Sequence, residues 1–282
     1  MTTVAVQNRK LDVQGREVAY RDYAGDFDAG SASVLWVHGG AFALGNLRMP
    51  EADAVAHALA EGSRRLIRTT SYRKVSVLGT VGVPRLRPHR HVFPAALDDV
   101  DAVLEDLLQR GPVFIGGASA GACIAASVVV RRRDRGQRMP SGMFLFYGTL
   151  HAALPGDHTA LARAARAARG GVFTPTGVFR MHRNYAGSAA ALAAGGIFPG
   201  DQSAEGLPPA LLVDAEKDTL RLSGGAYAAQ LKAADVPTTY VVVPGTTHGF
   251  MNKPDEPAFH EGIQHITTWL AEQAGLPPAD RA

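Results

Sequence analysis

Short apolar runs alternate along the chain with longer stretches of helical periodicity, which is typical of a mostly parallel sheet covered by helices. The expected buried strands are 34–37, 66–72, 113–115, 143–147, 210–213 and 239–243. The expected helices are about 50–61, 95–109, 120–130, 221–234 and 257–273. The first thirty residues add two β-rich segments, which we interpret as a short N-terminal cap element. The pattern predicts one α/β domain.

The segment from about 150 to 206 interrupts the alternation. It is rich in Ala, Gly, Arg and Pro, with helical patterns only near 159–169 and 176–195. Bulky apolar residues give it anchors for packing, namely Phe173, Phe179, Met181, Tyr185, Ile197 and Phe198. An insertion of this length between core strands predicts a lid on a single domain, whose core is 1–149 and 207–282.

Composition excludes several classes of protein. The net charge of +3, from 29 basic and 26 acidic residues, is too small to indicate a nucleic-acid partner. No apolar run approaches the roughly 18 residues of a membrane span, and the first ten residues lack the apolar centre of a secretory signal. The single cysteine forms no internal disulfide, and no pair of histidines with a carboxylate has metal-ligand spacing. We expect a cytoplasmic protein without a metal site.

The sharpest local signal is Gly117-Ala-Ser-Ala-Gly121, which follows an expected strand and opens an expected helix. In a nucleophile elbow, a strained turn holds the serine hydroxyl above the sheet, and small neighbours avoid clashes. The helix N-terminus also favours a developing oxyanion. A plain small-residue turn is the alternative, but the strand–helix context favours Ser119 as a nucleophile.

A serine hydroxyl needs a base, and the base needs an orienting carboxylate. One later strand releases Asp214, Glu216 and Asp218 at its carboxyl end, and the next ends in the loop that carries His248. Carboxyl ends of parallel strands meet at one sheet edge, so these side chains can converge near Ser119. We favour Asp218 as the acid, because Asp214 comes early at the strand end and Glu216 is more simply explained as solvated.

Donors for a tetrahedral oxyanion come from the segment His38–Phe42, directly after a strand. The backbone N–H groups of Gly39, Gly40 and Ala41 lie there without bulky side chains, and Ala120 follows the nucleophile. Such donors predict an oxyanion hole. Phe42 is a candidate substrate-binding residue of the acyl pocket, with core packing as an equal alternative.

These motifs resemble the α/β-hydrolase fold, specifically the hormone-sensitive-lipase-like (bacterial family IV) carboxylesterases. The matching segments are His38–Ala41, Gly117–Ala122, Asp218–Leu220 and His248–Phe250, with further likeness at 93–99, 206–211 and 227–233. The likeness spans about 33–271. Two departures stand out: Ala118 replaces the acidic residue before the nucleophile, and Ala41 replaces the third glycine of the oxyanion loop.

The resemblance implies hydrolysis of small or medium carboxylic esters through an acyl-enzyme, without a cofactor. It implies Ser119 as nucleophile, His248 as base and then acid, Asp218 as its orienter, and an oxyanion hole from Gly40, Ala41 and Ala120 with Gly39 nearby. Amide hydrolysis, lactone opening and acyl transfer would use the same residues. A non-catalytic small-molecule receptor on a hydrolase fold is the alternative from another class.

Three remaining features have structural interpretations. We expect Cys123 to be a small core residue. The arginines that end the same helix, from Arg131 to Arg138, are interpreted as a solvated helix end without an anion-binding role. The apolar strand 239–243 is expected near the sheet edge, where it could pair across a homodimer.

Overall fold

An eight-stranded sheet forms the centre of the molecule in the computed structural model, which describes residues 3–25, 30–76 and 91–273. Its strands stand in the order β1-β2-β4-β3-β5-β6-β7-β8. Their bounds are β1 Ala5–Asp12, β2 Glu17–Ala24, β3 Ser33–Val37, β4 Ile67–Thr70, β5 Val113–Ala118, β6 Gly142–Phe146, β7 Ala210–Ala215 and β8 Thr238–Val243. From β4 to β8 all neighbouring strands are parallel, which confirms the mostly parallel α/β fold.

The N-terminal segments form a hairpin at one edge of this sheet. β1 pairs antiparallel with β2, and β2 pairs antiparallel with β4, with Tyr20 opposite Thr70 and Tyr23 opposite Ile67. The two β-rich segments expected in the first thirty residues are confirmed as β1 and β2. The described residues extend the central sheet along the edge of β4 and do not form a separate N-terminal cap element.

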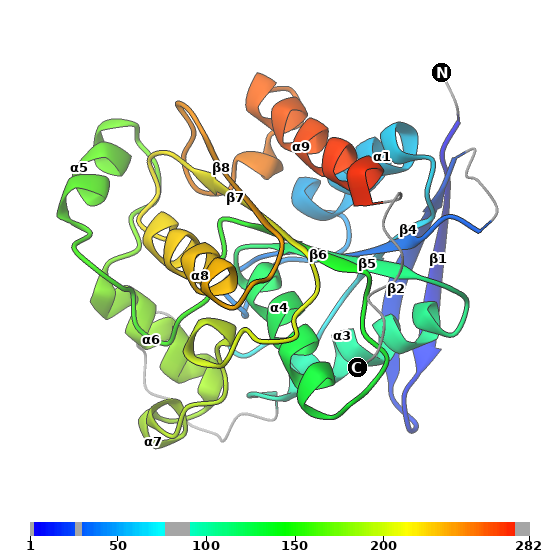
Figure 1. The fold of residues 1–282 in the computed structure, drawn as a ribbon, viewed down its shortest axis with the longest axis horizontal. Coiled ribbons are helices and arrows are strands. Elements are labelled where there is room, and N and C mark those ends of the chain that lie inside the picture. Colours follow the sequence, from blue (N-terminus) through cyan, green and yellow to red (C-terminus); the bar gives the residue numbers. More distant parts are fainter. Residues whose placement is uncertain (1–2, 26–29, 77–90, 274–282) are drawn as a thin grey trace.

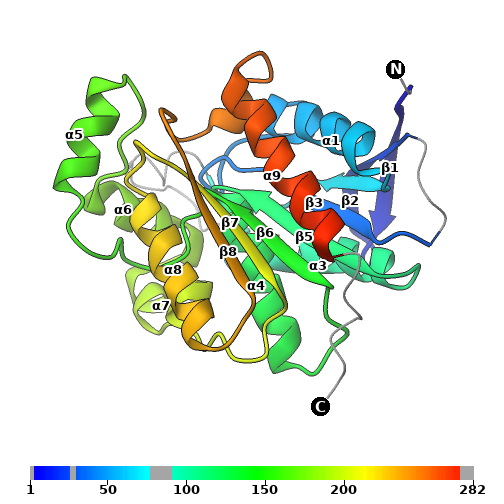
Figure 2. The same ribbon diagram turned by 45° about the horizontal axis from the view of Figure 1, so that its top comes forward.

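Helices cover both faces of the sheet (Figures 1 and 2). α1 (Pro50–Ser63) and α9 (Pro257–Gln273) pack together on one face. α3 (Ala95–Leu108), α4 (Ala120–Asp134) and α8 (Arg221–Ala233) cover the other. The sheet therefore lies between two separate apolar cores, as in a doubly wound fold.

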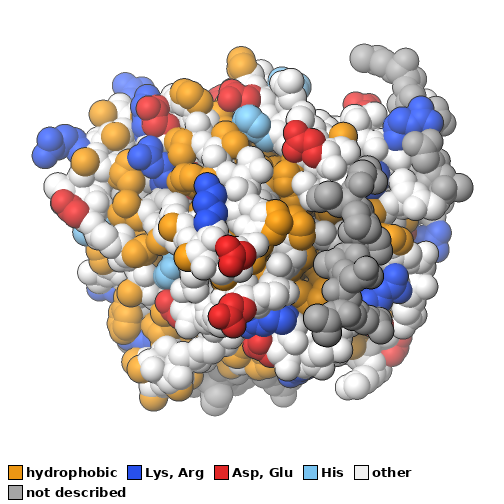
Figure 3. Space-filling view, in the orientation of Figure 1, with side chains coloured by type: hydrophobic (Ala, Val, Ile, Leu, Met, Phe, Trp, Pro, Cys, Tyr) orange, Lys and Arg blue, Asp and Glu red, His pale blue; other side chains and the backbone are white. Residues whose placement is uncertain are grey.

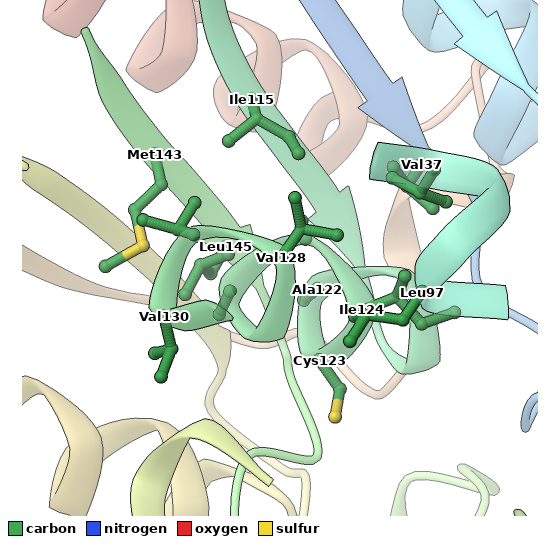
Figure 4. Close-up of a cluster of buried hydrophobic side chains, with 14 of the residues drawn as sticks. Val37, Leu97, Ile115, Ala122, Cys123, Ile124, Val128, Val130, Met143 and Leu145 are labelled. Atoms are coloured by element: carbon green, nitrogen blue, oxygen red, sulfur yellow. The ribbon is translucent and has the colours of Figure 1, made fainter. Parts of the chain in front are cut away.

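α4 is the most deeply buried helix, because it packs against β3, β5 and β6 as well as α3. Figure 4 shows its apolar side chains gathered with those of β5 and β6 and with Leu97 of α3. Cys123 lies in this core with 1% of its surface exposed, as expected, and burial raises the pKa of its thiol. The helix that begins at Ser119 is thus held by apolar contacts along its length.

The segment between β6 and β7 contains α5 (Thr159–Ala167), α6 (Pro175–Ala186), α7 (Ala189–Ala193) and the short 3₁₀ helix η1 (Pro199–Asp201). The helical pattern near 176–195 is confirmed, and two helices, α6 and α7, form there. Gly187 ends α6 with a φ of 95°, and the Ser188 side chain caps α7 by accepting a hydrogen bond from the Ala191 N–H. That this segment acts as a lid stays a prediction.

α6 is anchored to the rest of the molecule by buried polar and aromatic contacts. The His182 ring bonds to Thr149 Oγ1 at 2.8 Å and to the Ala152 carbonyl oxygen at 2.9 Å. Burial lowers the pKa of His182 to about 4, so the ring is neutral at pH 7. Tyr185 stacks on Phe42 with ring centroids 4.0 Å apart. These contacts fix α6 beside the loop that follows β3.

Two arginines near the end of α4 form ion pairs with another helix, and one of them is buried, so the expectation of a solvated helix end is wrong for them. Arg132 is 1% exposed and contacts Asp101 and Glu105, while Arg131 contacts Asp98 and Asp101. The acidic residues lie on one face of α3, and that face packs along α4. Tertiary packing thus converts a basic helix end into an interhelical ion-pair network.

On the face shown in Figure 3, basic, acidic and hydrophobic side chains are interspersed, without one continuous basic area. None of the helices in the described parts of the chain is both long enough and apolar enough to cross a membrane. β8 forms one edge of the sheet, as expected for 239–243. A homodimer paired across that edge stays a prediction.

Replacing Arg132 by Leu should lower the free energy of unfolding by about 3 kcal/mol, because it removes the buried cation that pairs with both Asp101 and Glu105 and leaves the buried Asp101 with Arg131 alone. Urea unfolding followed by circular dichroism measures the change. Arg135→Leu is the matched control on an exposed position of the same helix end, with an expected effect within about 0.5 kcal/mol. Equal effects of the two substitutions would contradict a stabilising role of the buried network.

Candidate active site

Ser119 stands in a sharp turn between β5 and α4. Its backbone has φ 55° and ψ −119°, a conformation that is strained for a residue with a side chain. The turn is possible because the residues two positions before and after Ser119, Gly117 and Gly121, lack a Cβ. At Gly117 a Cβ would lie 2.5 Å from the Gly121 carbonyl oxygen, and at Gly121 it would lie 2.2 Å from the Val37 carbonyl oxygen. The Ser119 hydroxyl is therefore placed at the N-terminus of α4.

Three side chains from separate loops form one hydrogen-bonded chain. The distance from His248 Nε2 to Ser119 Oγ is 3.0 Å, and the distance from His248 Nδ1 to Asp218 Oδ2 is 2.6 Å. Asp218 is fully buried, and its Oδ1 accepts the N–H of Leu220 at 3.0 Å. In this arrangement Nδ1–H donates to the carboxylate, and Nε2 accepts the proton of the serine hydroxyl.

The surroundings of His248 favour its protonated form. Burial works to lower its pKa, but the charge and hydrogen bond of Asp218, together with the charge of Glu51, raise the pKa above its usual value. The Tyr147 ring lies 4.9 Å from the imidazole and the Phe173 ring 4.5 Å, measured between centroids. The base is thus enclosed by aromatic rings and backed by negative charge.

The two alternative candidates for the acid, Asp214 and Glu216, are not hydrogen-bonded to His248. Asp214 is 1% exposed, its Oδ2 has no hydrogen-bond partner among the described residues, and burial and the nearby Asp218 raise its pKa well above the usual range. Glu216 accepts the N–H of Gly245 at 2.8 Å. Of these three acidic residues, only Asp218 is hydrogen-bonded to His248.

The expected oxyanion donors divide into two groups. The Gly39 N–H donates to Glu51 Oε2 at 2.6 Å, so its assignment to the oxyanion hole is wrong. The N–H groups of Gly40, Ala41 and Ala120 donate to no other group within the described part of the chain. They remain available to a ligand near Ser119. The sequence pattern could not separate these donors, because Glu51 reaches Gly39 only in the folded chain.

The Gly39 carbonyl oxygen is held from the opposite side. It accepts the Tyr72 hydroxyl at 3.1 Å and the His38 ring nitrogen Nδ1 at 2.7 Å. Burial lowers the pKa of His38 to about 4, which keeps this imidazole neutral with a proton on Nδ1. The Gly40 N–H belongs to the same peptide unit and points away from the carbonyl. Fixing the carbonyl therefore fixes the direction of one candidate oxyanion donor.

Phe42 belongs to the core. Its side chain is 1% exposed and packs between Tyr185 and Phe198, with ring centroids 4.0 and 6.5 Å away. Of its two interpretations, the structure favours core packing over a place in the acyl pocket. Phe42 and Ala41 both have positive φ, 61° and 53°. Their backbone strain is stored in the loop that carries the oxyanion donors.

The sequence motifs did not indicate three further residues of the site, Glu51, Tyr147 and Asn252. The Tyr147 hydroxyl and the Asn252 side-chain amide both donate a hydrogen bond to the Glu51 carboxylate, which lies behind the oxyanion loop. One sequence signal was present for Glu51, because it shares a helix face with the apolar residues Val55 and Leu59. A charged residue on the apolar face of a helix indicates a buried partner.

No group of three or more His, Cys, Asp or Glu side chains is placed to hold a metal ion in the ranges 3–25, 30–76 and 91–273. The residues gathered at this sheet edge are instead a nucleophile, a base, a carboxylate and backbone donors. Such a set suits acyl chemistry at a carbonyl carbon.

A strand–serine–helix elbow, with an acid and a histidine supplied by later parallel strands, defines an α/β hydrolase. The chain belongs to the α/β-hydrolase fold family, whose sequence model matches residues 34–252. This membership confirms the resemblance to the hormone-sensitive-lipase-like carboxylesterases that the motifs indicated.

Among curated relatives, the carboxylesterase NlhH of Mycobacterium tuberculosis is 30% identical over 234 residues, which cover 78% of this chain and 66% of that protein. The esterase LipI of the same species is 29% identical, with 77% and 65% covered. The chain thus spans just under two thirds of the length of these relatives.

Solved structures share the fold. An esterase from the archaeon Pyrobaculum calidifontis superposes with a TM-score of 0.82 at 24% identity, over 96% of this chain and 87% of that one. The carboxylesterase EstE1, cloned from a metagenomic library, also gives 0.82 at 24% identity, over 99% and 92%. At this identity the likeness shows the fold alone.

Replacing Asp214 by Asn should make the protein more stable relative to wild type as the pH rises above about 4. The unfolded chain ionises Asp214 near its ordinary pKa of about 3.9, whereas burial and the charge of Asp218 raise the pKa of Asp214 in the folded chain, so wild-type stability falls as the pH rises above the unfolded pKa. Asn cannot ionise and lacks this loss. Urea unfolding at several pH values from 4 to 8 measures it, and a constant stability difference across that range would show that folded Asp214 is ionised.

Proposed function

We propose that this protein is a serine carboxylic ester hydrolase that cleaves small or medium esters through an acyl-enzyme on Ser119. The observation that carries the proposal is the unbroken chain of hydrogen bonds from Ser119 through His248 to Asp218. It is supported by the relatives, two of which are named carboxylesterase and esterase. The nucleophile is only 8% exposed, and Phe173 lies against its base, which favours acyl groups of limited size.

Acylation begins when His248 Nε2 takes the hydroxyl proton of Ser119. The serine oxygen bonds to the ester carbonyl carbon, and the carbonyl oxygen becomes an oxyanion. The N–H groups of Gly40, Ala41 and Ala120 are the donors proposed to stabilise it, and removal of one oxyanion-hole donor costs about 3 kcal/mol in a serine protease of another fold. Asp218 keeps the imidazole oriented and stabilises its positive charge.

Collapse of the tetrahedral intermediate breaks the bond to the alcohol oxygen. His248 gives its proton to that leaving oxygen, and the alcohol departs from the acyl-enzyme. A water molecule then attacks the acyl carbon while His248 accepts its proton, and a second collapse releases the carboxylic acid and restores the Ser119 hydroxyl.

Replacing Ser119 or His248 by Ala should reduce kcat on a p-nitrophenyl ester by about 10⁶-fold, because the two groups act as one unit. Steady-state hydrolysis measures the loss. A fluorophosphonate should label the native protein and fail to label Ser119→Ala. Near-native turnover by either variant would refute the proposed roles, and absence of labelling in the native protein would favour a non-catalytic receptor.

The activity should fall on acidification, with a midpoint for kcat/KM above the pKa of about 6.5 of a free imidazole. The sign follows from the raised pKa of His248, because the protonated ring cannot accept the serine proton. A pH–rate profile on a substrate without titratable groups measures this midpoint. A midpoint well below 6.5 would contradict the electrostatics described for the site.

A further inference from the structure

The Glu51 carboxylate lies directly behind the oxyanion loop. The residue is 2% exposed, in the first turn of α1, and its side chain accepts three hydrogen bonds. Oε2 accepts the Gly39 N–H at 2.6 Å, while Oε1 accepts the Tyr147 hydroxyl at 2.7 Å and the Asn252 amide at 3.0 Å. Its backbone carbonyl oxygen accepts the Trp36 indole N–H at 2.6 Å, which fixes the turn itself.

The three donors come from three different parts of the active site. Gly39 precedes the oxyanion donors Gly40 and Ala41. Tyr147 follows β6, and its ring lies against His248. Asn252 ends the 3₁₀ helix η2 (Phe250–Asn252), which follows the histidine loop. One carboxylate therefore joins the oxyanion loop, the end of a central strand and the segment after the base.

The surroundings suit a carboxylate and no neutral side chain of the same size. All three partners are donors, and an ionised carboxylate is an acceptor at both oxygens. The N-terminus of α1 favours a negative charge in its first turn. A Cβ at Gly39 would lie 2.7 Å from Glu51 Oε2, so the glycine is what allows this close approach.

The hydrogen bond to Glu51 restricts the backbone of Gly39 from a second side. Its N–H is held by Glu51, and its carbonyl oxygen is held by Tyr72 and His38 on the other side. With both of its polar groups bound, Gly39 delivers the following Gly40 N–H in one direction. Preorganised donors of this kind need no reorganisation when charge develops in the transition state.

We propose that Glu51 is a positioning residue for ester hydrolysis, which orients the oxyanion loop through Gly39 and places a second negative charge behind His248. This inference rests on the proposed function. Ser119 and Asp218 are in hydrogen-bond contact with the His248 imidazole, Tyr147 and Phe173 face it with their rings, and the Glu51 charge acts on it through space. Removing the Glu51 charge lowers the pKa of His248, whereas removing the side chain also frees the loop.

The test compares Glu51→Gln and Glu51→Ala with Asp53→Asn. The control makes the same acid-to-amide change two residues along α1, where Asp53 binds Tyr23 and Arg21 instead of the active-site loops. Glu51→Gln keeps one acceptor and should lower kcat about 10-fold with little change in KM. Glu51→Ala should lower it about 10²-fold, as expected for displacement of an oxyanion donor.

The acidic limb of the kcat/KM profile distinguishes positioning from a merely structural role. In Glu51→Gln this limb should move to lower pH, because the imidazole loses a charge that favours its protonated form. In Asp53→Asn both kcat and the limb should stay at their native values. Circular dichroism and thermal melts report the folded fraction, and if Glu51→Ala does not fold, Glu51→Gln carries the test.

An unchanged kcat and an unmoved limb in folded Glu51→Gln would overturn the inference, as would a loss of rate that only parallels loss of folded protein. Failure of the proposed function has a different signature, since Ser119→Ala would then keep the native rate. A native enzyme that depends on Ser119 but not on Glu51 would leave the proposed function intact.

Discussion

The turn at Ser119 is the constraint on which the rest of this site depends. A residue with a side chain is held at φ 55° there, at a cost of about 1–3 kcal/mol. The cost is offset by the packing of α4, which is buried along most of its length between β3, β5, β6 and α3. Gly117 and Gly121 let the helix and strands approach so closely that the turn cannot relax. The position of the Ser119 hydroxyl at the N-terminus of α4 is thus a consequence of a rigid core.

Buried carboxylates in this molecule behave differently because their surroundings differ. Asp218 and Glu51 are each surrounded by hydrogen-bond donors, which suit an ionised carboxylate. Asp214 lies beside Asp218 with one oxygen unpartnered, and burial together with the charge of Asp218 raises its pKa well above the usual range. Two hydrogen-bonded carboxyl groups, those of Asp218 and Glu51, therefore lie behind His248, whereas the surroundings of Asp214 favour its protonated form.

The doubly wound sheet explains how distant residues meet. Ser119, Asp218 and His248 follow the carboxyl ends of β5, β7 and β8, which are parallel strands of one sheet. Parallel strands place all their carboxyl ends at one edge, and loops at that edge converge. The oxyanion loop follows β3 at the same edge.

The sequence by itself determined the parallel strands, the elbow and the three residues of the hydrogen-bonded chain. These follow from local patterns: apolar runs, small residues around a serine, and polar residues directly after strands. The roles of other residues depend on contacts between positions far apart in the sequence, and these are seen only in the folded structure. It assigned the Gly39 N–H to Glu51, buried Phe42 under Tyr185, and paired Arg132 with acids of another helix. A backbone donor or a charged side chain has the same local pattern whether it faces a ligand, the solvent or a buried partner, and only the folded chain specifies which of these it meets.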